Sequence, residues 1–140
     1  MNVNRWRKTM AKIICTHADN GITMLRHAKN GSVIETDLPK QVGGEGRLFC
    51  PGDLFAGSVA ACLLATMGEM AKHRGKSLGT TNITVGAEFS GKPEHVTRLT
   101  LKVEFDASID EVDRKKYLAA LNACPVRNSI DKDIEVVVTT

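Results

Sequence analysis

The chain has 140 residues, of which 42% are hydrophobic and 25% charged, the usual balance of a soluble globular protein. This length predicts a single domain, residues 1–140, with a sizeable hydrophobic core. A net charge of +3, scattered basic residues and an aromatic content of 4% argue against nucleic-acid binding. No run of about 18 apolar residues lacks a charge, so we also expect no transmembrane helix and no membrane partner.

The first eleven residues are basic, and we expect them to form a flexible arm. The arm has no apolar stretch after its charges, so it lacks the pattern of a secretory signal. The four cysteines are scattered, which favours free thiols in the cytoplasm over a disulfide framework. No cysteine or histidine spacing matches a zinc site, and no nucleotide, flavin or haem motif occurs, so we expect neither a metal nor a cofactor.

The next part of the chain predicts a three-stranded meander at residues 12–17, 22–27 and 32–37. Turn signals separate the strands, and Asn30-Gly31 favours a type I′ hairpin between the last two. Residues 38–49 follow as a glycine-rich loop that contains Arg47. The loop either cradles an anion at the start of the next helix or is simply a flexible connection.

A long apolar helix is predicted from Pro51 to Arg74. Proline suits the first helical position, Asp53 complements the helix dipole in the first turn, and Gly75 is a suitable C-terminal cap. The helix is apolar on nearly every face, which is typical of a helix that other structure covers on most sides.

The remaining residues predict two strands, a helix and a last strand. Residues 80–90 and 96–106 alternate apolar and polar side chains, as half-buried strands do. Ser108 and Glu111 have the spacing of a capping box for a helix that runs to about Ala123. The expected inner stripe of this helix is Ile109, Val112, Leu118 and Leu121. Cys124-Pro125 then starts a short turn, and residues 134–138 form the final strand. The fold class is therefore α+β, in the order βββ-α-ββ-α-β.

Two segments carry a resemblance to a known family. The helix opening Pro51-Gly52-Asp53-Leu54-Phe55-Ala56 with Ala60-Ala61-Cys62, and the later Cys124-Pro125-Val126, resemble the OsmC/Ohr family of thiol-dependent hydroperoxide reductases. The likeness extends from about Ile13 to Val138. It implies the OsmC-like fold and an intertwined homodimer, in which the central helices pack at the core and each active site draws residues from both chains.

The same resemblance implies a peroxidase that reduces organic hydroperoxides in oxidative-stress defence. Cys62 would be the peroxidatic thiol and Cys124 the resolving thiol, and a dithiol, such as a lipoyl-type one, would be the reductant. In the family an arginine tied by a glutamate assists the reactive cysteine. Arg26 and Arg47 are the candidates for this arginine. Gly52 occupies the glutamate position and Asp53 follows it, which marks a divergent member.

Other interpretations of these residues remain open. The chain is alternatively a non-catalytic OsmC-like dimer that binds a small apolar ligand, which Gly52 favours, or a thiol–disulfide redox sensor without turnover. Cys50 is either a weak helix cap or a third redox thiol. Phe55 and the neighbouring Leu48 and Phe49 either line a pocket for an apolar hydroperoxide or belong to the core.

Overall fold

A computed structural model of the protein describes residues 12–140, so the basic arm predicted at residues 1–11 lies outside the described residues. The chain divides into two compact units, Met1–Leu54, here the N-terminal unit, and Phe55–Thr140, the C-terminal unit. Each unit has its own three-stranded sheet. A single domain over the whole chain stays a prediction.

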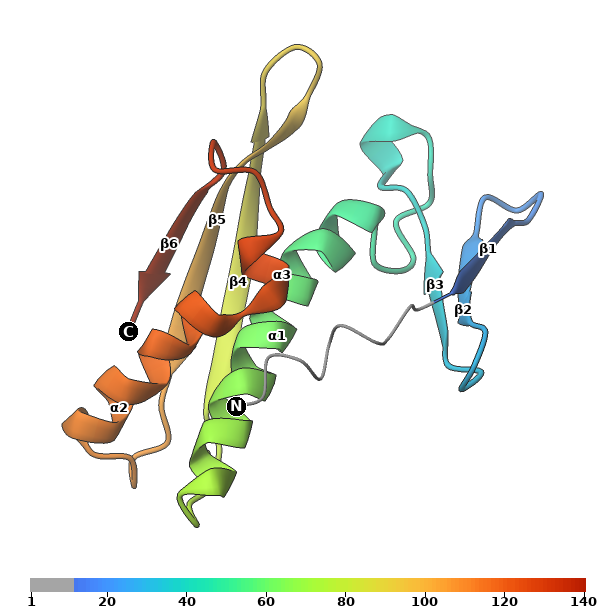
Figure 1. Ribbon diagram of the computed structural model, residues 1–140. Coiled ribbons are helices and arrows are strands. Elements are labelled where there is room, and N and C mark those ends of the chain that lie inside the picture. The colour runs from blue at the N-terminus through green and yellow to red at the C-terminus, as the bar shows by residue number, and fades with distance from the viewer. Residues whose placement is uncertain (1–11) are drawn as a thin grey trace. The chain divides into compact units, whose positions relative to one another are not determined.

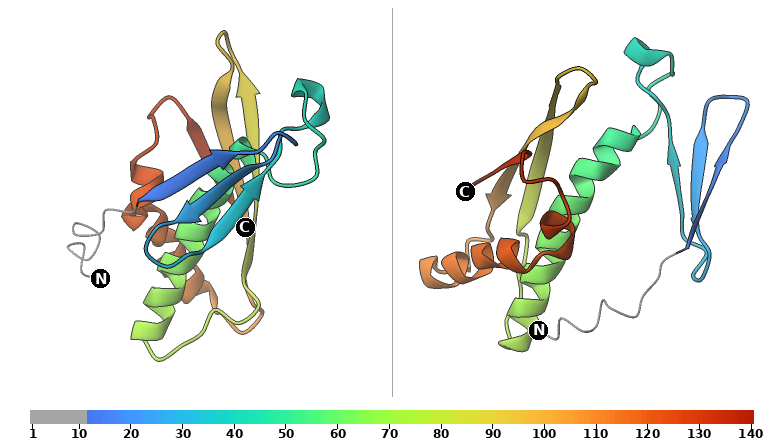
Figure 2. Two further views of the ribbon diagram at one scale, coloured as in Figure 1. Left: turned by 90° about the vertical axis from the view of Figure 1, so that its right-hand side faces the viewer. Right: turned by 45° about the horizontal axis from the view of Figure 1, so that its top comes forward.

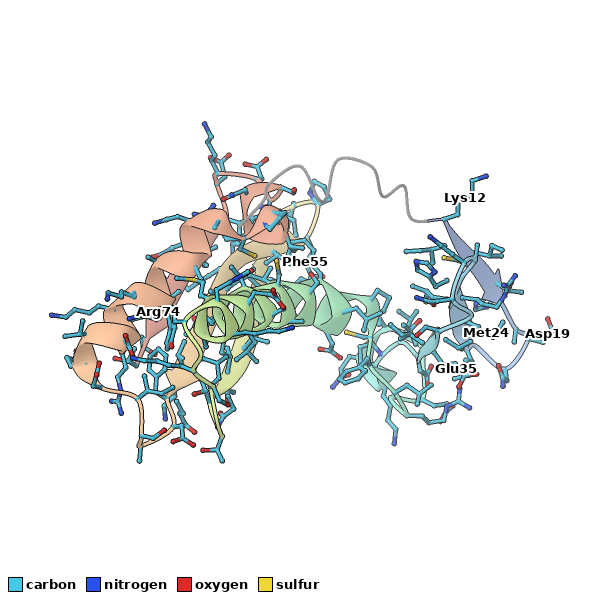
Figure 3. The ribbon with its side chains drawn as sticks, turned by 60° about the horizontal axis from the view of Figure 1, so that its bottom comes forward. Lys12, Asp19, Met24, Glu35, Phe55 and Arg74 are labelled. Carbon is cyan, nitrogen blue, oxygen red and sulfur yellow. The ribbon has the colours of Figure 1, made fainter. Side chains whose placement is uncertain are left out.

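The N-terminal unit contains the predicted meander, an antiparallel sheet in the order β1-β2-β3 (Figure 2). Its strands are β1 (Ile13–His17), β2 (Thr23–His27) and β3 (Val33–Thr36). In the β2–β3 pair, Met24 lies opposite Glu35, and Figure 3 shows these two side chains on adjacent strands. The loop that follows contains a single turn of 3₁₀-helix, η2 (Lys40–Val42).

The connection between β2 and β3 differs from the predicted type I′ turn. A type I′ turn needs a positive φ at both central residues, and no described residue other than glycine has one. Gly31 alone has a positive φ, 75°, and its N–H donates to the carbonyl of His27. The His27 Nδ1 accepts the N–H groups of Lys29 and Asn30. These hydrogen bonds stabilise a longer loop than the two-residue turn that Asn30-Gly31 predicts.

The long helix α1 (Pro51–His73) matches the predicted central helix. Its end is a glycine cap, because Gly75 adopts a φ of 66° and the N–H of Lys76 donates to the Ala71 carbonyl at 2.8 Å. The helix is long and apolar enough to cross a membrane by length and composition alone. Val59, Leu63 and Met67 of α1 are fully buried within the C-terminal unit, so we identify α1 as a core helix.

The sheet of the C-terminal unit joins β4 (Asn82–Ser90), β5 (His95–Glu104) and β6 (Glu135–Thr139). β4 and β5 are antiparallel, whereas β6 pairs in parallel with β5. Alternating burial along β5 confirms the predicted period of two, and α1 and α2 lie on the buried face (Figure 1). The core includes Leu99, Leu101 and Val103.

The predicted second helix is three consecutive pieces: α2 (Glu111–Leu118), η3 (Ala119–Ala123) and α3 (Pro125–Asn128). The predicted capping box is wrong: Asp110 is the N-cap, and its carboxylate accepts the N–H of Asp113 at 2.8 Å. Ser108 instead donates to Asp106 in the preceding turn. The predicted stripe is also wrong at Val112, which is 62% exposed, while the charged Asp113 is buried.

Asp113 is buried because two cations beyond the end of α1 compensate its charge. Its carboxylate accepts a hydrogen bond from Arg74 at 2.7 Å and a second from Lys76. Figure 3 shows Arg74 beside α2. Hydrogen bonds from Lys76 and then from Arg74 hold the pKa of Asp113 below its ordinary value of 3.8 against the opposing effect of burial. The three charges thus join the end of α1 to α2.

Candidate active site

The two cysteines singled out by the sequence lie together in the C-terminal unit. Cys62 is in the middle of α1, where its carbonyl accepts the hydroxyl of Thr66 at 2.8 Å in addition to the helical pattern. Cys124 is the N-cap of α3, directly before Pro125. The two thiols are within hydrogen-bonding reach of each other. A thiol pair this close is chemically able to alternate between a dithiol and a disulfide.

The environments of the two thiols differ. Cys124 has no exposed surface, whereas Cys62 is only partly buried. The pKa of the Cys124 thiol is raised to about 11, mainly by burial and to a smaller extent by the hydrogen bond with Cys62. The N–H of Arg127 donates to the Cys124 sulfur at 3.4 Å and acts in the opposite direction, but burial prevails. At neutral pH Cys124 is therefore a protonated thiol, and Cys62 is the more accessible sulfur.

A cavity of about 400 Å³ lies within the same unit. Its lining residues are Phe55, His95, Val96, Asp131, Asp133 and Ile134. They come from the start of α1, the start of β5 and the segment between α3 and β6. Phe55, for which the sequence left pocket and core as alternatives, lines this cavity and also packs against the core. Leu48 and Phe49 are exposed residues of the N-terminal unit.

The N-terminal unit contains an ion pair between two residues of the loop region. Arg47 Nε donates to Asp37 Oδ2 at 2.7 Å, and its Nη2 donates to the Asn20 carbonyl at 2.9 Å. The Asp37 side chain is 1% exposed and that of Arg47 is 44% exposed. The hydrogen bond from Arg47 lowers the pKa of Asp37 against the effect of burial. Asp37 and the Asn20 carbonyl thus hold the guanidinium of Arg47, whose side chain stays partly exposed.

The sequence analysis missed Asp37. It stands ten positions before Arg47, beyond the helical spacings that make charge pairs recognisable, and only the course of the loop brings the two together. Arg26 lies on β2 and makes no ion pair with any described residue. Arg26 and Arg47 belong to the N-terminal unit, while Cys62 and Cys124 belong to the C-terminal unit.

Asp53 and Cys50 form the start of α1. The Asp53 carboxylate accepts the backbone N–H of Cys50 at 2.8 Å, which is the returning bond of a capping box. This contact gives Asp53 a structural role at the start of α1, and a catalytic role of Asp53 stays a prediction. Within residues 12–140, no three His, Cys, Asp or Glu side chains are grouped so that they could hold a metal ion.

Comparison with solved structures shows the same fold in several bacterial proteins. A protein of Psychrobacter arcticus 273-4 named for osmotic stress induction and detoxification response is 27% identical, with a TM-score of 0.87 over 96% of this chain and 98% of that chain. The organic hydroperoxide resistance protein OsmC of Legionella pneumophila is 18% identical, with a TM-score of 0.75 over 94% and 96%. The organic hydroperoxide resistance protein OhrB of Bacillus subtilis is 17% identical, with a TM-score of 0.67 over 94% and 97%.

Comparison with curated protein sequences gives no significant match. The family model described as OsmC-like protein matches residues 44–139, which include both Cys62 and Cys124. The match begins in the glycine-rich loop and ends in β6, so it covers all of the C-terminal unit except its last residue. This chain is therefore a member of the OsmC-like protein family.

Proposed function

We propose that this protein is a thiol-dependent peroxidase that reduces organic hydroperoxides and acts in oxidative-stress defence. The observation that carries the proposal is the contact between Cys62 and Cys124, which are far apart in the sequence. The names of the Legionella and Bacillus proteins, which refer to organic hydroperoxide resistance, support the same chemistry. The different burial of the two thiols supports Cys62 as the attacking thiol and Cys124 as the resolving thiol.

The reaction balances with these two thiols and one external reductant. The Cys62 thiolate attacks the terminal oxygen of the hydroperoxide, the O–O bond breaks, and the alkoxide takes a proton to leave as an alcohol. Cys62 is then a sulfenic acid. The Cys124 sulfur attacks the Cys62 sulfur, an S–S bond forms, and the hydroxyl leaves as water with the proton of Cys124. A dithiol of the lipoyl type returns the disulfide to two thiols and becomes oxidised itself.

Burial of Cys124 suits the resolving role. A protonated thiol with a pKa of about 11 does not compete with Cys62 for the peroxide, because the thiolate is the nucleophile. Once Cys62 is oxidised, the attack by Cys124 is fast despite its high pKa, because the two sulfurs are already close together. Cys62 therefore reacts first because it is accessible, and Cys124 reacts second because it is buried and protonated.

Arg47 is the better of the two candidates for the assisting arginine. Asp37 ties its guanidinium in the way that the resemblance assigns to a glutamate, while Gly52 occupies the position of that glutamate. Arg26 has no such partner among the described residues. We propose that Arg47 assists the Cys62 thiolate and that Asp37 is its positioning residue. Asp53 is the second candidate for the acidic residue that positions the arginine, and substitution of Asp53 tests this role directly.

We also propose that the protein works as an intertwined homodimer in the cytoplasm. The N-terminal sheet leaves Ile13, Ile14 and Ile34 between 45% and 55% exposed, and a partner subunit would cover part of this apolar surface. The exposed side of α1 carries the small residues Ala61 and Ala65, which permit close approach of another helix. Sedimentation is expected to give twice the 15.2 kDa chain mass. A monomer at micromolar concentration contradicts this part.

The decisive experiment measures cumene hydroperoxide consumption with a dithiol reductant, together with intact-protein mass. Cys62→Ser is expected to lose turnover, whereas the matched control Cys15→Ser, at an exposed thiol of the other unit, keeps it. Stoichiometric peroxide should lower the mass of the wild-type protein by two hydrogens through a Cys62–Cys124 bond. In Cys124→Ser, the mass should instead rise by one or more oxygens at Cys62.

The alternative functions give different results in the same experiment. A redox sensor would form the Cys62–Cys124 bond without sustained turnover. A non-catalytic dimer that binds a small apolar ligand would show neither the bond nor turnover. Full turnover by Cys62→Ser overturns the proposed function.

A further inference from the structure

Phe55, the residue of α1 that lines the cavity in the C-terminal unit, lies on the same helix face as Cys62. Phe55 lines the cavity, and Cys62 follows seven residues later in the same helix. Seven residues are almost two complete helical turns, so both side chains lie on one face, about 10 Å apart along the axis. An apolar substrate body that contacts Phe55 would thus occupy the same helix face as the reacting sulfur.

The walls of the cavity combine an apolar surface with hydrogen-bond acceptors. Phe55, Val96 and Ile134 supply the apolar part, and the polar part is supplied by three side chains, Asp131, Asp133 and His95. The volume of about 400 Å³ lies within the range of small-molecule sites. The apolar residues favour an organic body over hydrogen peroxide, because burial of hydrocarbon surface is the main source of affinity for such ligands.

The tautomer of His95 follows from its contact with the preceding loop. Its Nδ1 lies 2.9 Å from the Pro93 carbonyl, which only accepts hydrogen bonds, so Nδ1 carries the proton. In the neutral ring Nε2 is then an acceptor. Gly91 leaves room for this ring, since a Cβ there would approach the ring carbon Cε1 to 2.5 Å. Among residues 12–140 no lysine or arginine lines the cavity, and Lys132, between the two aspartates, is absent from its walls.

We propose that this cavity holds the organic body of the hydroperoxide and that Asp131 and Asp133 make the enzyme select uncharged hydroperoxides against those that carry a carboxylate. The proposal rests on the proposed function and specifies its substrate class. The uncharged ring of such a hydroperoxide packs against Phe55, Val96 and Ile134, and its hydroperoxide group stays free to react with Cys62. A carboxylate on the same ring brings a negative charge near Asp131 and Asp133, which repel it.

The test compares two substrates of almost equal shape, cumene hydroperoxide and its 4-carboxy derivative, which is anionic at neutral pH. At low ionic strength, wild-type protein is expected to show a kcat/KM for the neutral substrate at least about tenfold higher than for the anion. The double variant Asp131→Asn/Asp133→Asn should reduce this preference about fivefold or more by accelerating the anion. The asparagine at 131 retains an oxygen that can accept the N–H of residue 133, as Asp131 does in the structure.

The matched control is Glu104→Gln/Glu111→Gln, which removes two exposed negative charges of the same unit away from the cavity. It should leave the preference unchanged. In wild-type protein, added salt should lower the ratio of kcat/KM for the neutral substrate to that for the anion, because salt screens the repulsion of the anion. This second measurement needs no variant, so it tests the proposal even if the aspartate variant folds poorly.

A binding measurement tests the cavity without turnover. The unreactive product alcohol of cumene hydroperoxide should shift the NMR signals of the Val96 and Ile134 methyl groups, and the methyl groups of β1–β3 should not move. An unchanged preference in the aspartate variant, with normal turnover of the neutral substrate, overturns the selectivity and leaves the proposed function intact. Absence of turnover of both substrates in wild-type protein overturns the proposed function and this inference with it.

Discussion

The two sheets of this protein have equal numbers of strands but very different interiors. The sheet β4-β5-β6 buries Leu99, Leu101 and Val103 almost completely beneath two helices. The sheet β1-β2-β3 leaves the apolar side chains of Ile13 and Ile34 about half exposed. A three-stranded sheet needs an apolar face covered by something to be stable. The C-terminal unit thus has its own core, whereas the apolar side chains of the N-terminal sheet would be covered by the partner in the proposed dimer.

The largest expected difference between the sheets is in core truncation. Leu101→Ala removes a fully buried side chain from the C-terminal unit and should lower the free energy of unfolding by about 2–5 kcal/mol. Ile34→Ala, in the other sheet, should change unfolding of the monomer by less than about 1 kcal/mol and weaken self-association instead. Denaturant unfolding and sedimentation measure the two effects. Greater loss of monomer stability at Ile34 than at Leu101 would contradict the comparison.

Thiol accessibility gives the next largest difference. Cys15 on β1 is exposed, whereas Cys124 is buried with its pKa raised from 9.0 to about 11. The raised pKa alone lowers the thiolate fraction at neutral pH about 100-fold relative to an ordinary thiol. Mass spectrometry of iodoacetamide-labelled peptides should show alkylation of Cys15 at least that much faster than of Cys124. In denaturant the two rates should converge, and equal rates in the folded protein would refute the burial of Cys124.

A smaller effect is expected from acid. The pKa of Asp113 is lowered in the folded protein from 3.8, so its contribution to stability is present above about pH 4 and is lost as pH falls through the folded pKa. Asp113→Asn should therefore be less stable than wild type at pH 7, and the gap should close below pH 4. Asp37→Asn should show the same trend in the N-terminal unit, because Arg47 lowers that pKa too. Unfolding curves from pH 2 to 7 measure both differences in stability. A difference that grows as pH falls would contradict the prediction.

The smallest effect is expected at the exposed face of the C-terminal sheet. Arg98 on β5 forms an ion pair with Glu135 on β6 at 2.9 Å, with both side chains about half exposed. Exposed pairs of this kind contribute less than about 1 kcal/mol. Arg98→Ala should lower the unfolding free energy by no more than that, and added salt should reduce the difference. A loss as large as that of Leu101→Ala would show that this face is covered.

The sequence predicted the elements whose signals are local. Pro51 and Gly75 mark the two ends of α1 by their backbone preferences, and the alternation of β4 and β5 reflects burial on one face. The errors arose where tertiary contacts override local preference. Asp113 faces inward because Arg74 and Lys76 neutralise it, and these two cations belong to a distant part of the chain.

The candidate site shows the same division. Only the resemblance, and not any spacing, connected Cys62 with Cys124, because their contact depends on how α3 returns to α1. The raised pKa of Cys124 was unpredictable for the same reason, since proline after a cysteine suggests a helix start and a lower pKa. Burial outweighs the helix start here. The Asp37–Arg47 pair likewise exists only through the folded course of the loop.

The position of Cys62 within α1 makes the two sulfurs mechanically unequal. Its backbone is fixed by helical bonds on both sides and by the extra bond from Thr66. Cys124 stands instead at the junction of a 3₁₀ turn and a helix of four residues. Short segments of this kind reopen more easily than the middle of a long helix. If the proposed disulfide forms, the shift that joins the two sulfurs should therefore fall on α3, while Cys62 stays in place.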